Sequence, residues 1–195
     1  MNQSGKTLYT KLETHRFSFL DRARDCSRLT IPTLIPEEGH SSGRKFPTPY
    51  NGTGARGVNN LASSLLLSLL PPNSPFFRLV LDDAAMRQVE GLPDVKTEIE
   101  RSLADIEKAV MKEVESDNVR VSMFEILKHL IVGGNCLIQF PSEGGVRVFP
   151  LSRYVVQRCS MGLPLHIVTK ESIQPDALPE EIQGQVGGMS MGNMD

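Results

Sequence analysis

The stretch ESDNVRVSMFEILKHLIVGGNCLIQFP, residues 115–141, decides the fold because the spacing of its apolar residues changes halfway along it. Ser116-Asp117-Asn118 breaks one helical pattern and can cap the next, which is predicted to end at Gly133-Gly134-Asn135. The following run, Cys136 to Phe140, is short and bounded by turn residues, which is typical of a strand. Helices therefore give way to strands at this pair of glycines.

Three helical patterns are predicted before that junction. They run from Thr7 to about Arg28, from Val58 to Leu70, and from Asp94 to the break at Ser116. The second is apolar on most of its surface, so we expect it to be buried. The third has one apolar stripe opposite an acidic face, which is typical of a helix with one side in solvent.

Short apolar runs dominate the chain after the junction. Turn residues separate them, so we expect an antiparallel meander of hairpins over residues 136–140, 146–149, 154–159 and 165–170. A further strand is predicted at 76–81 and a short helix at 176–183. N-terminal helices followed by an antiparallel meander place the chain in the α+β class.

The chain is predicted to divide into four segments. They are an amphipathic N-terminal helix (1–30), an irregular arm rich in proline and glycine (31–57), a core of helices and β-meander (58–182), and a disordered tail (183–195). Irregular segments as long as the arm are often functional.

Composition argues against a membrane-spanning protein, a disulfide-bonded or metal-binding protein, and a DNA-reading domain. The 195 residues are 39% hydrophobic, which suits a globular domain, and no apolar run is long enough to span a membrane. Cys26, Cys136 and Cys159 lie far apart, so we expect reduced thiols and no metal. Residues 1–57 hold nine Lys and Arg against five Asp and Glu, and residues 82–117 hold five against eleven, an asymmetry unlike a DNA-reading domain.

Gly52-x-Gly54-x-x-Gly57 has the spacing of a dinucleotide-binding loop. That loop requires a strand ending at the first glycine, whereas Pro47 and Pro49 precede it here. We therefore expect no nucleotide and no other cofactor. The glycines are interpreted as allowing a close approach to a neighbouring segment.

Gly39-His40-Ser41-Ser42-Gly43 matches the G-x-S-x-G pattern of a nucleophilic serine. No strand or helix is predicted on either side of it, and a general base would have to come from His129 or His166. Gly5-Lys6-Thr7 lacks the upstream part of a phosphate loop, and Asp82-Asp83 lacks further metal ligands. No active site is therefore predicted.

Four blocks of sequence together indicate a family. They are TIPTLIP (30–36), GARGVNNLASSLLLSLLPPNSPFFRL (54–79), the opening stretch 115–141, and LSRYVVQR (151–158) with LHIVTKESI (165–173). In this order and at these intervals they closely resemble the head-to-tail connector, or portal protein, of short-tailed bacteriophages.

The resemblance implies a non-catalytic structural protein that forms a dodecameric ring at the capsid vertex of the virion. Its implied partners are other copies of itself and the capsid, terminase and tail proteins, with assembly in the host bacterial cytoplasm. Duplex DNA would pass through the ring during packaging and ejection without sequence-specific contact. The matched part resembles only the outer wing, so we expect the stem, clip and crown to lie beyond Asp195.

The start of the second helix is the predicted interface. Gly54 and Gly57 permit close approach, Arg56 can bind a carboxylate or carbonyls, and Asn59 and Asn60 can satisfy exposed amides. We expect this segment to be a packing loop, either within the wing or against an adjacent subunit. Two alternatives remain open from the residues alone, namely a small cytosolic serine hydrolase using Ser41 and a freestanding helical adaptor.

Overall fold

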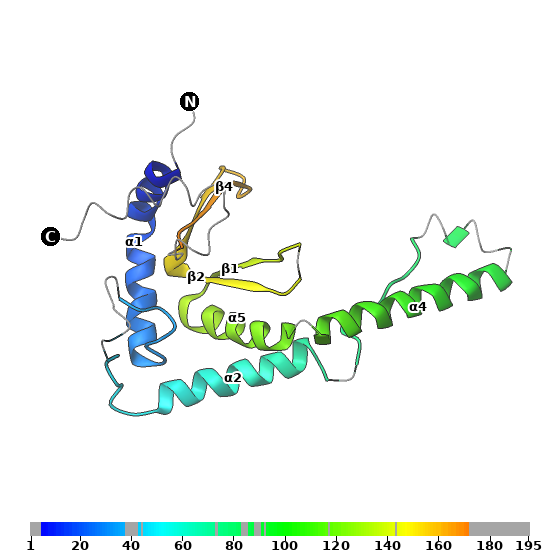
Figure 1. Ribbon diagram of the computed structural model, residues 1–195, viewed down its shortest axis with the longest axis horizontal. Helices are drawn as coiled ribbons and strands as arrows, with labels where there is room; N and C mark the ends of the chain where they lie inside the picture. Colours follow the sequence, from blue (N-terminus) through cyan, green and yellow to red (C-terminus); the bar gives the residue numbers. More distant parts are fainter. Residues whose placement is uncertain are drawn as a thin grey trace, which may run out of the picture.

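The computed structural model describes residues 5–37, 43, 45–72, 74–82, 86–87, 91, 93–116, 118–142 and 144–171. The helices that come first are α1 (Gly5–Leu29), α2 (Thr53–Leu69), α4 (Pro93–Ser116) and α5 (Val119–Gly133) (Figure 1). The predicted helix at 176–183, the predicted tail at 183–195, and Ser41 lie outside the described residues.

Two β-hairpins follow the helices. Strand β1 (Cys136–Gln139) pairs antiparallel with β2 (Arg147–Pro150), and β3 (Tyr154–Arg158) pairs antiparallel with β4 (Pro164–Thr169). A 3-10 turn, Leu151–Arg153, joins the hairpins, which are two separate two-stranded sheets. The predicted α+β class is confirmed.

A small core lies between α1 and the arm that follows it. Leu20 and Ala23 of α1 pack with Ile35 of the arm, and Leu34 and Leu151 cover this cluster. The helical spacing of apolar residues also placed Phe19 and Cys26 on the apolar face of α1, and this part of the prediction is wrong because both are exposed. The buried line of α1 instead includes a polar residue, Ser27.

Ser27 fixes the arm to the end of α1. Its hydroxyl donates a hydrogen bond to the carbonyl of Ile31 at 2.8 Å and accepts one from the backbone N–H of Ile35 at 3.2 Å. These two bonds satisfy backbone groups that the irregular arm would otherwise leave unpaired. Residues 31–37 at the start of the arm therefore lie on α1 although they form no helix or strand.

Arg16 joins α1 to the second hairpin. Its guanidinium donates to the carbonyl oxygens of Leu151, Ser152 and Tyr154, and to the hydroxyl of Tyr9 at 3.1 Å. The Tyr9 hydroxyl itself donates to the carbonyl of Ser152 at 3.1 Å. A periodicity analysis does not detect this contact, because it treats an arginine within an amphipathic helix as a solvent-facing residue.

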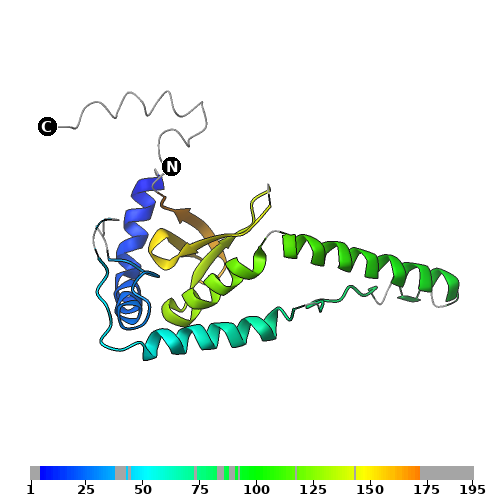
Figure 2. The ribbon, with the colours of Figure 1, turned by 60° about the horizontal axis from the view of Figure 1, so that its bottom comes forward.

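Helix α2 lies along α5 (Figures 1 and 2). Val58 and Ala62 are the buried side chains of α2, facing a helix whose Ile126 and Leu127 are also buried. The expectation that α2 is buried on most of its surface is therefore wrong in the single chain. Its other leucines are largely exposed, among them Leu61, Leu65, Leu67 and Leu69.

The break between α4 and α5 is confirmed. Asn118 adopts the left-handed conformation at φ 53°, and its carbonyl accepts from the N–H of Val121 at 2.9 Å. Gly134 ends α5 at φ 72°, where its N–H donates to the carbonyl of Leu130 at 3.0 Å. A residue with a side chain would be strained at φ 72°, which explains the glycine at the junction of helix and strand.

Helix α4 projects away from the rest of the molecule (Figures 1 and 2). The extended segment 76–82 runs beside it, and the N–H of Leu79 donates to Glu107 Oε1 at 2.5 Å. The strand predicted at 76–81 is wrong, because this segment has no strand partner in the part of the chain that the structure describes. An exposed helix provides no backbone groups with which a strand could pair.

Candidate assembly interface

The predicted interface residues lie on the first turns of α2. Helix α2 begins at Thr53 instead of Val58, so the expected loop at residues 54–60 is helical. The side chain of Asn51 accepts from the N–H of Thr53 at 3.1 Å, and the carbonyl of Gly52 accepts from the N–H of Arg56 at 3.0 Å. These bonds start the helix earlier than the glycines suggest.

Gly54 makes the close approach that the sequence suggests. A Cβ on Gly54 would lie 2.9 Å from the carbonyl oxygen of Leu29 and 3.1 Å from Cγ2 of Thr30. Glycine therefore allows the start of α2 to contact the end of α1. Gly57 has no such role within the chain, since a Cβ there would meet no atom within 4 Å.

The polar members of the predicted interface face outward. Arg56, Asn59 and Asn60 are exposed, and their side chains make no hydrogen bond or ion pair with the residues that the structure describes. Helical spacing places Arg56 beside both asparagines on one surface of α2. This surface is available for a contact outside the chain.

The sequence patterns that resemble catalytic or nucleotide-binding motifs gain no support from the structure. Residues 45–49 before the glycine string form no strand, and Gly5-Lys6-Thr7 begins α1. His166 lies exposed on β4, whereas His129 is buried on α5, and this burial lowers its pKa. Within the described ranges, no three metal-ligating side chains lie close enough to hold an ion.

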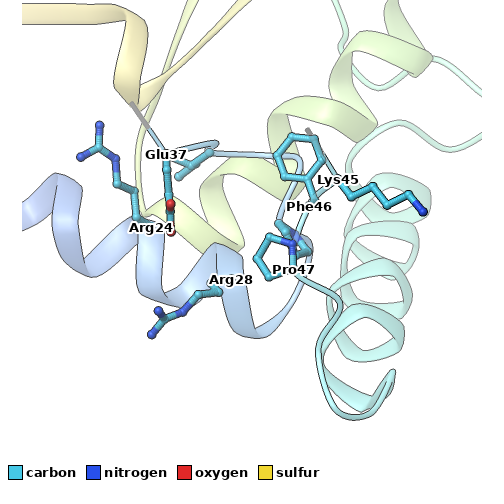
Figure 3. Close-up of a pocket in the computed structure, with 8 residues that line it drawn as sticks. Arg24, Arg28, Glu37, Lys45, Phe46 and Pro47 are labelled. Atoms are coloured by element: carbon cyan, nitrogen blue, oxygen red, sulfur yellow. The ribbon is translucent and has the colours of Figure 1, made fainter. Parts of the chain in front are cut away.

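A pocket of about 350 Å³ lies between α1 and the arm (Figure 3). Arg24 and Arg28 of α1 line it together with Glu37, Lys45 and Phe46 of the arm. Figure 3 shows the charged ends of Arg24, Arg28 and Lys45 pointing in three different directions. An anion site requires donors that converge on one point, so this arrangement is no such site.

A larger groove of about 500 Å³ separates α1 from the two hairpins. Its apolar lining includes Leu12, Phe19, Leu137, Val156 and Ile167. Its charged lining consists of Arg16 and Arg158, with His15 beside them, and the carboxylate of Glu13 lies 3.7 Å from the guanidinium of Arg16.

Tyr154 lies at the floor of this groove. Burial raises the pKa of its phenol to about 12, so the phenol is neutral at pH 7. Burial also raises the pKa of the Cys136 thiol, which is free like the thiols of Cys26 and Cys159. The floor is therefore uncharged apart from Arg16, whose guanidinium is bound to backbone carbonyls.

The exposure of the apolar stripe of α4 is the feature that sequence reasoning missed. Every α4 side chain that the structure describes is at least partly accessible to solvent. Val95, Ile106 and Val110 are 40%, 50% and 41% exposed. The sequence contained one indication of this exposure. The apolar stripe runs along nearly the whole of α4, and segment 76–82 is too short to cover it.

No helix in the described ranges is both long and apolar enough to cross a membrane. Large exposed apolar surfaces are typical of protein–protein contacts. The exposed apolar side chains of α2 and α4 are therefore candidate contact surfaces.

The chain belongs to the family of bacteriophage head to tail connecting proteins, whose model matches residues 2–190. It is 38% identical over 185 residues to the portal protein of Enterobacteria phage T3, and 37% identical over 188 residues to that of Escherichia phage T7. It is 30% identical over 182 residues to the portal protein of Pseudomonas phage phiKMV.

These alignments cover 93%, 94% and 93% of the chain but only 34%, 35% and 35% of the relatives. The chain thus spans about a third of the length of the curated relatives that it matches. The predicted family is confirmed, and the match favours neither a hydrolase using Ser41 nor a freestanding adaptor.

Proposed function

We propose that the chain forms the outer, wing-like region of a ring at one capsid vertex, through which phage DNA is packaged and ejected. The family match along nearly its whole length carries this proposal. In this role the chain is structural and has no active site of its own. The exposed apolar surfaces of α2 and α4 support the proposal, because they suit contacts with other subunits.

The finer features of the proposal come from the family resemblance. The ring has twelve copies, and the stem, clip and crown belong to parts of the protein that follow the wing. Capsid, terminase and tail proteins bind the assembled ring. It is built in the host cytoplasm and remains at the vertex of the virion.

In this proposal duplex DNA passes the subunit without sequence readout. The cationic side chains around the pocket of Figure 3 diverge, and a base-reading surface needs side chains that converge on one groove. We assign the basic residues of α1 to contacts with protein partners.

We also propose separate roles for the residues at the start of α2. Gly54 serves packing within the subunit, whereas Arg56, Gly57, Asn59 and Asn60 face an adjacent subunit. Their exposure and their unbonded side chains support this division. Arg56→Ala should weaken ring assembly without changing the melting temperature of the isolated chain, and Lys112→Ala on α4 is the exposed control.

Immunoelectron microscopy tests the function directly. An antibody against residues 5–171 is applied to opened particles of the phage that encodes the chain, with an antibody against the major shell protein as control. We expect one labelled vertex in each particle. Label spread over the shell, or absent from particles that the control antibody labels, would contradict the proposal.

A further inference from the structure

Two surfaces at opposite ends of the molecule match each other in apolar character and charge. One is the apolar stripe of α4, and the other is the groove between α1 and the hairpins, together with the outward face of α1. We infer that α4 of one copy lies in this groove of the next copy. The inference rests on the proposed ring and identifies one of its subunit contacts.

The inserting surface is one side of α4. Val95, Ile99, Ile106 and Val110 follow helical spacing along it, so their side chains form one continuous stripe. Acidic side chains border this stripe, namely Glu98, Asp105 and Glu113. The other side of α4 is already occupied, since Glu107 binds the backbone of segment 76–82.

The receiving surface has the opposite charge. Six exposed residues of α1 follow helical spacing: Lys11, His15, Phe19, Arg22, Cys26 and Leu29. Two of them, His15 and Phe19, also line the groove. Phe19 is 63% exposed, and the guanidinium of Arg22 lies 5.8 Å from the centre of its ring. The residues that line the groove include no acidic residue, and the exposed Asp25 next to the α1 face is paired with Arg28 at 3.2 Å.

The charges of the two helices also match as totals. Helix α1 contains six Lys and Arg against three Asp and Glu, a net charge of +3. Helix α4 contains four against seven, a net charge of −3. The helices have nearly equal lengths of 25 and 24 residues, so one can follow the other along its whole length. An amphipathic helix in an apolar groove with a complementary rim is a common mode of recognition.

The two surfaces of one chain do not meet. Helix α4 leaves the molecule at the start of α5 and extends away from α1 (Figures 1 and 2). The contact must therefore form between copies, and it joins two different surfaces. A contact of this head-to-tail type leads to a closed ring or to an open filament, depending on the rotation between copies.

Cross-linking between two variants tests the contact. One variant keeps its exposed Cys26, and the other carries Cys26→Ser together with Val95→Cys, Ile106→Cys or Val110→Cys. The two are mixed under mild oxidation, and peptide mass spectrometry identifies the disulfide. We expect at least one stripe position to react with Cys26 about tenfold faster than Lys108→Cys, an exposed control on the opposite side of α4, because contact raises the effective concentration.

Charge exchange provides a second measurement, by sedimentation of the chain at increasing concentration. Arg22→Glu alone and Glu98→Arg alone should each weaken self-association, and a mixture of the two variants should restore it. Equal cross-linking at the stripe and at Lys108→Cys, a failure of the mixture to restore association, or a chain that is monomeric at every concentration would each overturn the contact. A single labelled vertex in the phage would leave the proposed function intact in all three cases.

Discussion

Helices α1 and α4 have nearly equal lengths but differ in how they contact the rest of the chain. We call α1, the arm, α2, α5 and the hairpins the body, and α4 the projection. Helix α1 buries side chains against the arm and contacts the second hairpin through Arg16. Helix α4 buries no side chain that the structure describes, and its main partner is the extended segment beside it. A regular apolar stripe therefore does not by itself determine burial within the same chain.

The difference between them lies in the polar contacts. The guanidinium of Arg16 donates to the carbonyl oxygens of Leu151 and Ser152 in the 3-10 turn. In α4 the Lys108–Asp105 pair, at 3.3 Å, is exposed and contributes little stability. Helix α1 is thus held by polar contacts within the chain, whereas α4 has few such contacts among the described residues.

Arg16→Ala should have the largest effect on stability. It removes the guanidinium donor from the carbonyl oxygens of Leu151 and Tyr154 and one of the two donors to that of Ser152, so we expect the free energy of unfolding to fall by about 3 kcal/mol. Urea unfolding followed by circular dichroism measures this change. Arg101→Ala on the projection is the matched control, and it should change stability by less than ~0.5 kcal/mol. Equal effects of the two variants would contradict the distinction between body and projection.

The next largest effect should come from the two glycines at the start of α2. Gly54→Ala forces a methyl group against the carbonyl of Leu29, so we expect a loss of about 1–2 kcal/mol. Gly57→Ala meets no neighbour and improves helix propensity, so we expect a gain of about 0.5–1 kcal/mol. Thermal melts of the two variants measure opposite shifts. Shifts of the same sign would mean that α2 does not contact α1 through Gly54.

The helices, strands and family could be predicted from the sequence because they depend on local signals. The glycines after α5 and the turn residues between the strands act over a few positions, so the α+β class followed from them. The start of α2 was placed too late, because Gly54 and Gly57 resemble a loop. At Gly54 the glycine instead reflects a contact with Thr30, which lies 24 positions earlier in the chain and which local spacing cannot detect.

The candidate interface could be predicted only in part. The polar side chains at the start of α2 are exposed, and their role between subunits is a proposal. The stripe of α4 was identified as apolar, and only the acidic side opposite it was expected to face solvent. Its exposure depends on the path of the whole chain, because α4 and α1 end on opposite sides of the molecule (Figure 1).

A smaller effect is expected from His129, which belongs to the body. Burial lowers the pKa of His129 from its usual 6.5. The carboxylate of Glu125, whose Oε1 lies 3.8 Å from Nε2 of His129, partly offsets this effect. Below about pH 6.5 the unfolded chain therefore binds more protons than the folded chain, and the free energy of unfolding falls as the pH is lowered. Urea unfolding at pH 7 and pH 5 measures this fall. His129→Gln should reduce it, and an unchanged pH dependence in that variant would assign the effect to other groups.

The smallest effect should follow from Ile106→Ser on the α4 projection. The side chain is half exposed in the single copy, so we expect the free energy of unfolding of the dilute chain to change by less than ~0.5 kcal/mol. The same variant should markedly weaken self-association, because a hydroxyl replaces an apolar contact between copies. Chemical unfolding at low concentration and sedimentation at high concentration separate the two results. A large loss of stability in the dilute chain would show that α4 packs within its own copy, and the comparison between body and projection would then be wrong.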